Sequence, residues 1–361
     1  MTTISTDLTR LGWSDHFSSQ LQRLPEAQTL TPARVSIAHA DRFQLIGARD
    51  PVATLSGRLR REIAGDPIAR PGVGDWVGLR AGVIQHVFAR TSQLVRKAAG
   101  RESRPQLIAA NVDTVFIVTA ADQPLNPRRL ERYLAAIWGG GAQPALVQNK
   151  IDLVGDSPAD IEARARAELG PVAQNLPIVA VSGHASANIE PLLRHIEVGQ
   201  TAAFVGISGV GKSTLVNRLL GQPLQRTGDT RAGDGKGRHT TTHRELFVLD
   251  SGRLLIDSPG MREFGLWDAD EGLSETFEDV SSLAERCRFR DCTHQGEPGC
   301  AVRDELDPAR LASFRKLQRE DRYEARRRNE RSRRDDTKTR WKQITKSQRQ
   351  RRRHDPKLRT D

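Results

Sequence analysis

The residues most able to do chemistry form one glycine-rich stretch with the pattern G-x-x-x-x-G-K-[ST]. Its glycines allow backbone N–H groups to approach an anion closely. Lys212 would bring a mobile positive charge to the outer phosphates, and the Ser213 hydroxyl would join the coordination shell of Mg²⁺. The predicted phosphate-binding loop consists of Gly206, Ile207, Ser208, Gly209, Val210, Gly211, Lys212, Ser213 and Thr214.

Two further polar motifs each follow a short apolar run. Asn-Lys-Ile-Asp and Ser-Gly would both lie at the carboxyl ends of parallel strands, where open α/β sheets bind their ligands. The Asp152 carboxylate could accept both N–H donors of a guanine edge, and adenine lacks that pair of donors. Asn-Lys-x-Asp is a weak signal alone, but with the phosphate-binding loop it indicates a guanine nucleotide. The residues predicted to surround the base are Asn149, Lys150, Ile151, Asp152, Ser182 and Gly183.

Downstream of the phosphate-binding loop lie two segments that could respond to the γ-phosphate. Thr227–His243 is rich in Gly, Thr and Arg and suits a segment that closes over phosphates. Asp257-Ser258-Pro259-Gly260 follows a predicted hairpin. Asp257 could hold a Mg²⁺-bound water, and the Gly260 N–H could contact the γ-phosphate. We predict Mg²⁺ ligation by Ser213, Asp257 and one threonine of 240–242, for which Thr241 is our choice.

All three cysteines of the chain lie within fourteen residues of one another, around one histidine. The spacing is Cys287-x4-Cys292-x-His294-x5-Cys300. Three thiolates and one imidazole complete a tetrahedral Zn²⁺ shell with no open position, so we predict one structural zinc ion. The alternative is three reduced cysteines beside a surface histidine.

Strands and helices alternate in the middle of the chain, which predicts an α/β fold with a mainly parallel sheet. The expected strands are Val115–Val118, Ala145–Val147, Ile178–Val181, Ala202–Val205 and the hairpin Glu245–Leu249 with Leu254–Ile256. The expected helices are Pro127–Trp138, Ala159–Leu169, Ile189–Ile196 and one that follows the phosphate-binding loop.

The region before this sheet reads as a small β-barrel. Its five short runs, separated by Gly, Pro and Asp, suit a closed barrel of the oligonucleotide-binding (OB) type. The runs are Val35–Ile37, Phe43–Ile46, Thr54–Leu59, Trp76–Leu79 and Val83–Val87. Arg58, Arg60 and Arg61, on its strands and loops, could meet phosphate or could simply form a solvated face. The apolar residues of the N-terminal arm could dock as a short helix, or the arm could be disordered.

Positive charge is concentrated at the C-terminus. From Arg310 onward there are 21 Lys and Arg against 8 Asp and Glu, a net charge of +13, whereas the whole chain carries +11. A helix is expected from Pro308 to about Arg328, and the residues after it look disordered alone but able to order on RNA. No segment is long and apolar enough for a membrane span or a secretory signal, so we expect a cytoplasmic protein without a membrane partner.

The order of the motifs is itself informative. Ordinary small GTPases begin with the phosphate-binding loop and end with the base-reading motifs, and here the base-reading motifs come first. With the barrel, the cysteine spacing and Gly237-Arg238-His239-Thr240-Thr241-Thr242, the chain resembles the RsgA (YjeQ) family of circularly permuted GTPases. The resemblance implies a late assembly factor of the small ribosomal subunit that binds near its decoding region. GTP hydrolysis in that family is stimulated by the subunit and accompanies release.

The resemblance also suggests roles for single residues. The position after Asp-x-x-Gly, which holds a water-orienting Gln in many GTPases, is Met261 here. The family's substitute corresponds to His239, which we include with Lys212 and Asp257 as predicted catalytic residues. Slow hydrolysis without the subunit would follow.

The predicted organisation has six parts: an arm (1–32), an OB barrel (33–96), a basic linker (97–106), the permuted GTPase domain (107–264), a zinc-binding domain (265–334) and a basic tail (335–361). The expected partners of a monomer are GTP or GDP and the small subunit with its rRNA. Two other functions are weighed: an RNA-binding assembly module that uses GTP as a switch, and a P-loop ATPase or kinase.

Overall fold

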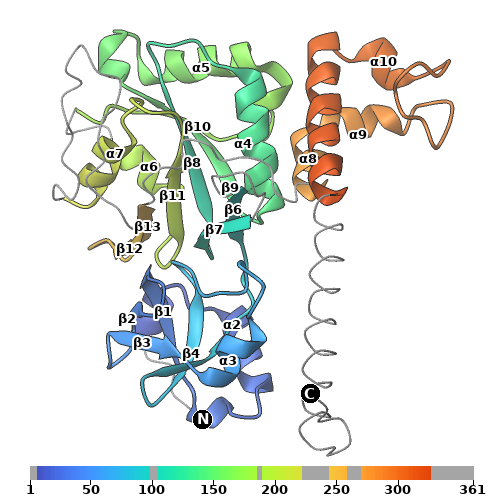
Figure 1. The fold of residues 1–361 in the computed structure, drawn as a ribbon. Helices are drawn as coiled ribbons and strands as arrows, with labels where there is room; N and C mark the ends of the chain where they lie inside the picture. Colours follow the sequence, from blue (N-terminus) through green and yellow to red (C-terminus); the bar gives the residue numbers. More distant parts are fainter. Residues whose placement is uncertain (1–5, 98–104, 185–188, 222–243, 258–269, 327–361) are drawn as a thin grey trace, which may run out of the picture.

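The structure is a computed structural model that describes residues 6–97, 105–184, 189–221, 244–257 and 270–326. Figure 1 shows a β-barrel at one end, an α/β sheet with helices on both faces, and a helical module that packs beside helix α4. This arrangement confirms the predicted fold class.

The N-terminal segment docks on the barrel. It forms α1 (Thr6–Arg10), α2 (Asp15–Arg23) and the 3-10 turn η1 (Ala27–Thr29). Trp13 and Phe17 are buried in one cluster with Trp76 and Phe88, and the Trp13 and Trp76 rings meet edge to face with centroids 4.9 Å apart. Because these rings lose most of their contact with water, the docked-helix alternative is the correct one for the described residues of this segment.

The barrel closes in the order β1-β2-β3-β5-β4, with β1 pairing with both β2 and β4. All strand pairs of the barrel are antiparallel except β3 with β5, which is parallel. A helix lies in the chain between β3 and β4. The strands are β1 (Thr31–Ala38), β2 (Phe43–Ile46), β3 (Val52–Leu55), β4 (Trp76–Arg80) and β5 (Val83–Val87).

The third barrel strand is shorter than predicted. It ends at Leu55, and the predicted continuation to Leu59 is instead helix α3 (Gly57–Glu62). The Ser56 hydroxyl accepts a hydrogen bond from the Leu59 N–H, a helix N-cap that competes with strand continuation. Arg58, Arg60 and Arg61 therefore lie on this helix and not on strands or loops, as the sequence had suggested.

The central sheet has the order β10-β9-β8-β11-β13-β12, and only β12 runs antiparallel to its neighbour. The strands are β8 (Thr114–Ala120), β9 (Gln143–Asn149), β10 (Ile178–Ala180), β11 (Thr201–Val205), β12 (Glu245–Val248) and β13 (Leu254–Asp257). The helices and 3-10 turns around it are α4 (Pro127–Gly139), η2 (Ile151–Leu153), α5 (Pro158–Leu169), η3 (Gly170–Ala173), α6 (Glu190–Leu193) and α7 (Lys212–Leu219). All the predicted elements of this region are present, although α6 is only one turn long.

A two-stranded antiparallel sheet, absent from our predictions, joins the barrel to the central sheet. It consists of β6 (Gln93–Lys97) and β7 (Pro105–Ala110), which pair from Gln93 with Ala110 to Lys97 with Pro105. The ends of the expected 97–106 linker are thus strand residues, and the segment between them lies outside the described residues.

Arg34 of β1 connects three parts of the molecule. Its guanidinium donates hydrogen bonds to the carbonyl oxygens of Leu11 (2.6 Å), Gly74 (3.0 Å) and Asn111 (2.9 Å), which belong to the arm, the barrel and the turn before β8. Complete burial lowers its pKa to about 10, although the charges of Asp113 and Asp75 oppose this effect. The side chain remains a cation at neutral pH and holds the barrel against the sheet.

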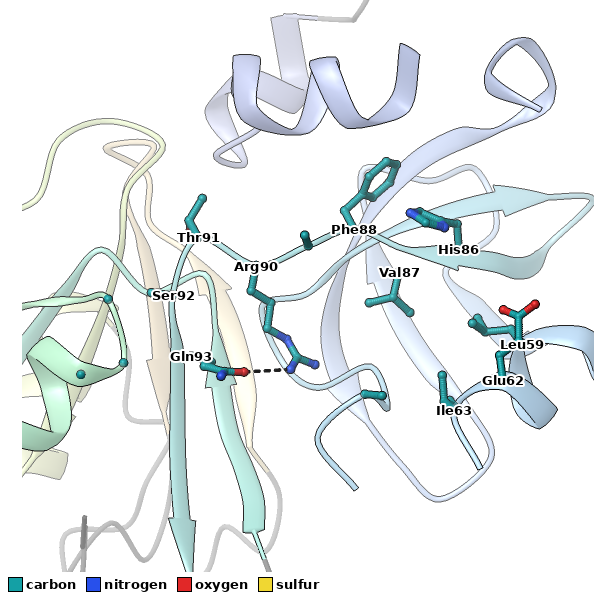
Figure 2. A pocket seen from close by; sticks show the side chains of 15 residues that line it. Leu59, Glu62, Ile63, His86, Val87, Phe88, Arg90, Thr91, Ser92 and Gln93 are labelled. Atoms are coloured by element: carbon teal, nitrogen blue, oxygen red, sulfur yellow. Dashed lines mark hydrogen bonds between the residues drawn. The ribbon is translucent and has the colours of Figure 1, made fainter. Parts of the chain in front are cut away.

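A second arginine contacts the same junction. Arg90 makes a bidentate ion pair with the fully buried Asp75, with both N–O distances 2.8 Å, and also donates to Gln93. Figure 2 shows this side chain among the residues that line a cleft of about 590 Å³ between α3, strand β5 and residues 139–141 at the end of α4. The cleft lies at the barrel junction, away from the phosphate-binding loop.

The C-terminal module packs on α4. It contains α8 (Asp270–Thr276), α9 (Glu278–Ala284), α10 (Ala301–Glu305) and a last helix over residues 308–326. Gly272 touches the backbone of α4 so closely that a Cβ there would lie 1.9 Å from the Ala135 oxygen. Leu273, Phe277 and Leu317 share one apolar cluster with Ala135, so the module and α4 have a common core.

A buried ionic cluster reinforces this contact. Arg310 donates to Glu131 of α4 at 2.6 Å and to both carboxylate oxygens of Asp279 at 3.0 Å, and Ser313 donates to the other Glu131 oxygen. The Arg310 and Glu131 side chains are 7% and 3% exposed, so each charge depends on the other for compensation.

We expect Arg310→Met to destabilise the docked module by about 3–5 kcal/mol, because it leaves Glu131 and Asp279 buried without a cation. Hydrogen exchange of the α8 and α9 amides, together with denaturant unfolding, measures this. Lys316→Met on the exposed side of the same helix is the matched control. A loss below about 1 kcal/mol in the Arg310 variant, equal to that of an ordinary surface change, would contradict the expectation.

Among the described helices, none is long and apolar enough to cross a membrane.

Candidate nucleotide site and metal centre

The phosphate-binding loop connects β11 to α7, as predicted. Gly206, Gly209 and Gly211 adopt positive φ angles of 140°, 85° and 93°, which favour glycine. Two of them also lack room for a side chain, since a Cβ at Gly206 would lie 2.4 Å from the Val118 oxygen and one at Gly211 2.2 Å from Asn149 Nδ2. The loop therefore curls tightly at the N-terminus of α7, a geometry that suits an anion.

Lys212 begins α7 and its side chain folds back over the loop. The ammonium group donates to the carbonyl oxygens of Gly206 at 2.9 Å and Ile207 at 2.7 Å. These contacts place the positive charge directly above the backbone turn. Ser213 and Thr214 follow in the first turn of the helix, where their side chains are half-buried.

Asn149 joins the three predicted motifs. It ends strand β9 and is 1% exposed. Its amide donates to the Val210 oxygen of the phosphate-binding loop at 2.7 Å, and its carbonyl accepts from the Gly183 N–H at 2.9 Å. One buried side chain therefore holds the phosphate-binding loop and both base-reading segments together, although they are far apart in the sequence.

The other base-reading residues lie where the strands end. Lys150 has a left-handed backbone (φ 65°) that turns the chain into η2, which contains Ile151 and the exposed Asp152. The buried Ser182 hydroxyl donates to one Asp152 carboxylate oxygen, which orients the carboxylate. The remaining acceptor sites of Asp152 are open to an incoming ligand, because the carboxylate is exposed to solvent.

Arg218 is a contributor that the sequence analysis missed. From the last turn of α7 its guanidinium donates to the carbonyl oxygens of Gly183 at 3.2 Å and His184 at 3.1 Å. It thereby ties the helix after the phosphate-binding loop to the Ser-Gly segment. The only signal in the sequence was a basic residue on α7, and such residues are ordinarily solvated.

Asp257 ends β13, which runs parallel to β11 with Ile256 opposite Ala203. The register brings the Asp257 carboxylate to the same edge of the sheet as the phosphate-binding loop. His239, Thr241 and Gly260, also predicted for this site, lie outside the described residues, and so do Ser258 and Pro259.

The four predicted metal ligands form one cluster in the C-terminal module. The ligand atoms of Cys287, Cys292, His294 and Cys300 all lie within 4.8 Å of one another. His294 Nδ1 is 3.6 Å from Cys287 Sγ and 3.5 Å from Cys300 Sγ, and those two sulfurs are 4.0 Å apart. These separations are close to the roughly 3.5–3.8 Å that ligands of a tetrahedral Zn²⁺ would have. The cluster could hold a metal ion.

A nearby arginine offers an independent test of this fit. The Nε and Nη2 atoms of Arg315 are buried and have no hydrogen-bond partner in the part of the chain that the structure describes. Arg315 is close enough to His294 to reinforce the lowering of the imidazole pKa that burial causes, while Glu297 opposes it. A divalent metal with three thiolates and a neutral imidazole carries a net single negative charge, which is the counter-charge that this guanidinium lacks. The residues therefore fit a Zn²⁺-type centre.

Comparison with known proteins places these sites in a family context. The sequence profile described as RsgA GTPase matches residues 87–267. The chain is 45% identical to the small ribosomal subunit biogenesis GTPase RsgA of Opitutus terrae, over 96% of this chain and 98% of that protein. It is 39% identical to the protein of that name from Syntrophotalea carbinolica, over 87% and 89% of the two chains.

Two solved structures share the fold. YjeQ from Thermotoga maritima superposes with a TM-score of 0.57, at 24% identity, over 81% of this chain and 98% of that one. YloQ, a circularly permuted GTPase, gives a TM-score of 0.57 and 24% identity, with 82% and 97% of the two chains covered.

Proposed function

The chain belongs to the RsgA family of circularly permuted GTPases, and from this membership we propose that it hydrolyses GTP as a late assembly factor of the small ribosomal subunit. GTP phosphohydrolase activity is the family's chemistry. We propose in addition that the small subunit stimulates hydrolysis and that the protein then dissociates. This second proposal draws on the names of the relatives and on the distribution of charge along the chain.

The Asn149 contacts are the single observation that carries the guanine nucleotide assignment. They join the base-reading segments to the phosphate-binding loop, so one ligand can span from Asp152 to Lys212. Asp152 accepts hydrogen bonds from the paired N–H donors of guanine, and the Ser182 hydroxyl orients the acceptor. A competition experiment with ATP against GTP checks this selectivity directly, and equal binding of the two would contradict it.

Each residue of the site has a distinct part in hydrolysis. Backbone N–H groups of residues 206–214 bind the phosphates, and Lys212 stabilises the charge on the β- and γ-phosphate oxygens. Ser213, Asp257 and Thr241 would hold Mg²⁺, which neutralises developing phosphate charge when bound with GTP. Gly260 would sense the γ-phosphate through its N–H.

The attacking water needs a positioning group. Met261 cannot orient water, so we propose that His239 does so when the subunit is bound. This arrangement implies that hydrolysis is slow in the absence of the subunit.

The partners follow from the charge distribution. A net charge of +13 from Arg310 onward suits rRNA phosphates, and the OB barrel is a fold that binds oligonucleotides. We assign the tail (335–361) to phosphate contacts, the barrel to RNA and the metal centre to a structural Zn²⁺ ion. We also propose that the protein is a cytoplasmic monomer. Its six parts would have the boundaries predicted from the sequence.

GTP turnover with and without purified small subunits tests the proposal. We expect slow turnover of the protein alone and an increase of at least about tenfold when subunits are added. Subunit binding should also weaken steeply as salt rises, because phosphates are being neutralised. Full-rate turnover without subunits would contradict the proposal. Nucleotide-dependent binding without any stimulated turnover would instead support an RNA-binding module that uses GTP only as a switch.

A further inference from the structure

Two exposed aromatic side chains of the metal module take no part in its core, Tyr323 on the last helix and Phe289 beside the metal ligands. Phe289 lies between the first two cysteines of the cluster and is 41% exposed. In the same module Phe277 is fully buried and packs against Phe314 with ring centroids 5.2 Å apart. A single exposed aromatic ring is common on protein surfaces, so its surroundings must decide whether it has a partner.

The ring is flanked by two arginines that carry exposed positive charge. Arg288 and Arg290 are both exposed, and the Arg288 guanidinium carbon lies 5.5 Å from the Phe289 centroid. Two other exposed arginines of the module have acidic partners, since Arg286 pairs with Glu305 and Arg303 with Asp304. Within the described residues, no ion pair is found for Arg288 or Arg290.

The backbone holds this loop in place from both sides. Arg288 N–H donates to the Gly299 oxygen at 3.0 Å, and Cys292 N–H donates to the Phe289 oxygen at 3.3 Å. Gly299 has a φ of 73°, and a Cβ there would press on the Arg288 Cβ at 3.1 Å. The metal ligands Cys287 and Cys292 bracket the loop. A ring presented by a rigid loop loses little entropy on binding.

We propose that Arg288, Phe289 and Arg290 form a platform on which an unpaired base of RNA stacks. One nucleotide of single-stranded RNA offers both a flat π face and a phosphate, which matches a ring between two cations on three consecutive residues. This platform deepens the proposed function, because it names a contact between the metal module and the rRNA of the small subunit. An acidic protein surface would satisfy the arginines but would leave the flat ring without a matching partner.

Binding of the full-length protein to purified small subunits, with a non-hydrolysable GTP analogue, tests the platform. Phe289→Ala should weaken binding by roughly 5- to 150-fold, the range for loss of one stacked base. Phe289→Trp should retain the affinity of the unaltered protein. Val248→Ala, which truncates an equally exposed apolar residue on β12, is the matched control and should change affinity less than twofold. Zinc content and the circular dichroism of each variant show that it is folded.

Two readouts separate the platform from a merely structural role. The emission of the Phe289→Trp variant should be quenched by added single-stranded rRNA fragments beyond any change in the unaltered protein, because a stacked base quenches indole fluorescence. Arg288→Gln with Arg290→Gln should reduce the salt dependence of binding.

The outcomes distinguish this inference from the proposed function. If the unaltered protein does not bind subunits, the proposed function fails. If it binds and Phe289→Ala binds equally well, only the platform is wrong. If Phe289→Ala loses affinity for intact subunits but not for extracted rRNA, the ring contacts a ribosomal protein and the RNA platform is overturned.

Discussion

Replacing Lys212 by alanine is expected to lower GTP turnover by about 10²–10³-fold at saturating small subunits, the usual effect of removing one preorganised charge from the transition state. The structure gives the physical reason. The Lys212 ammonium group lies over the loop, within 2.9 Å of the Gly206 oxygen and 2.7 Å of the Ile207 oxygen, at the N-terminus of α7. Lys212 is the only lysine or arginine in the first turn of α7.

Single-turnover hydrolysis and GDP affinity, measured separately, divide this effect into its parts. If Lys212 acts mainly in the transition state, the rate constant falls far more than the affinity. Lys316→Ala, which removes an exposed lysine distant from the site, should leave basal turnover unchanged. Turnover of Lys212→Ala within threefold of the unaltered protein would show that phosphate charge is neutralised by other groups.

Removal of the metal is expected to unfold the C-terminal module. Cys300 is fully buried, belongs to the module's apolar cluster and caps α10 through its sulfur, which accepts from the Arg303 N–H at 3.4 Å. Without an ion, the three sulfurs and the buried Arg315 nitrogens lose their common counterpart. Apparent binding energies of structural Zn²⁺ reach about 10–16 kcal/mol in small domains, which exceeds what a module of this size gains by packing alone.

Chelation and a ligand substitution test this in parallel. Treatment with a strong chelator, or Cys292→Ser, should abolish zinc binding and expose the amides of α8 to α10 to hydrogen exchange. Gln295→Ala, a change at an exposed neighbour that is not a ligand, is the control. GTP binding should persist in all of these forms, because the contacts of Asn149 and Lys212 lie in the central sheet. Retention of a protected module after complete loss of metal would contradict the structural assignment.

The parts of the site that depend on short sequence spacing could be predicted. A phosphate-binding loop and a cysteine cluster are local patterns, and their residues meet because the chain between them is short. The parallel strands were also recognisable, since Val115 to Val118 and Ala202 to Val205 are continuous apolar runs covered on both faces.

The contacts that join distant segments could not be predicted. Arg34, Arg218 and Arg310 belong to no recognisable motif in the sequence, yet each donates hydrogen bonds across more than thirty residues of chain. Such pairs depend on the packed fold and leave no periodic signal. The first three residues of α3 were predicted to continue β3, but the Ser56 cap begins a helix there instead. Strands β6 and β7 escaped notice because a basic stretch separates them.

The strand order of the central sheet has a consequence for synthesis on the ribosome. Strands β8, β9 and β10 are contiguous in the chain and can pair as soon as they emerge, but β8 also pairs with β11 in the centre of the sheet. Roughly 80 residues separate β8 from β11, so at about 5–20 residues per second the apolar edge of β8 lacks its partner for roughly 4–16 s. During those seconds the nascent chain presents an open strand edge, a template for pairing with other chains. The rearranged motif order therefore makes this protein a candidate for chaperone protection during its own synthesis.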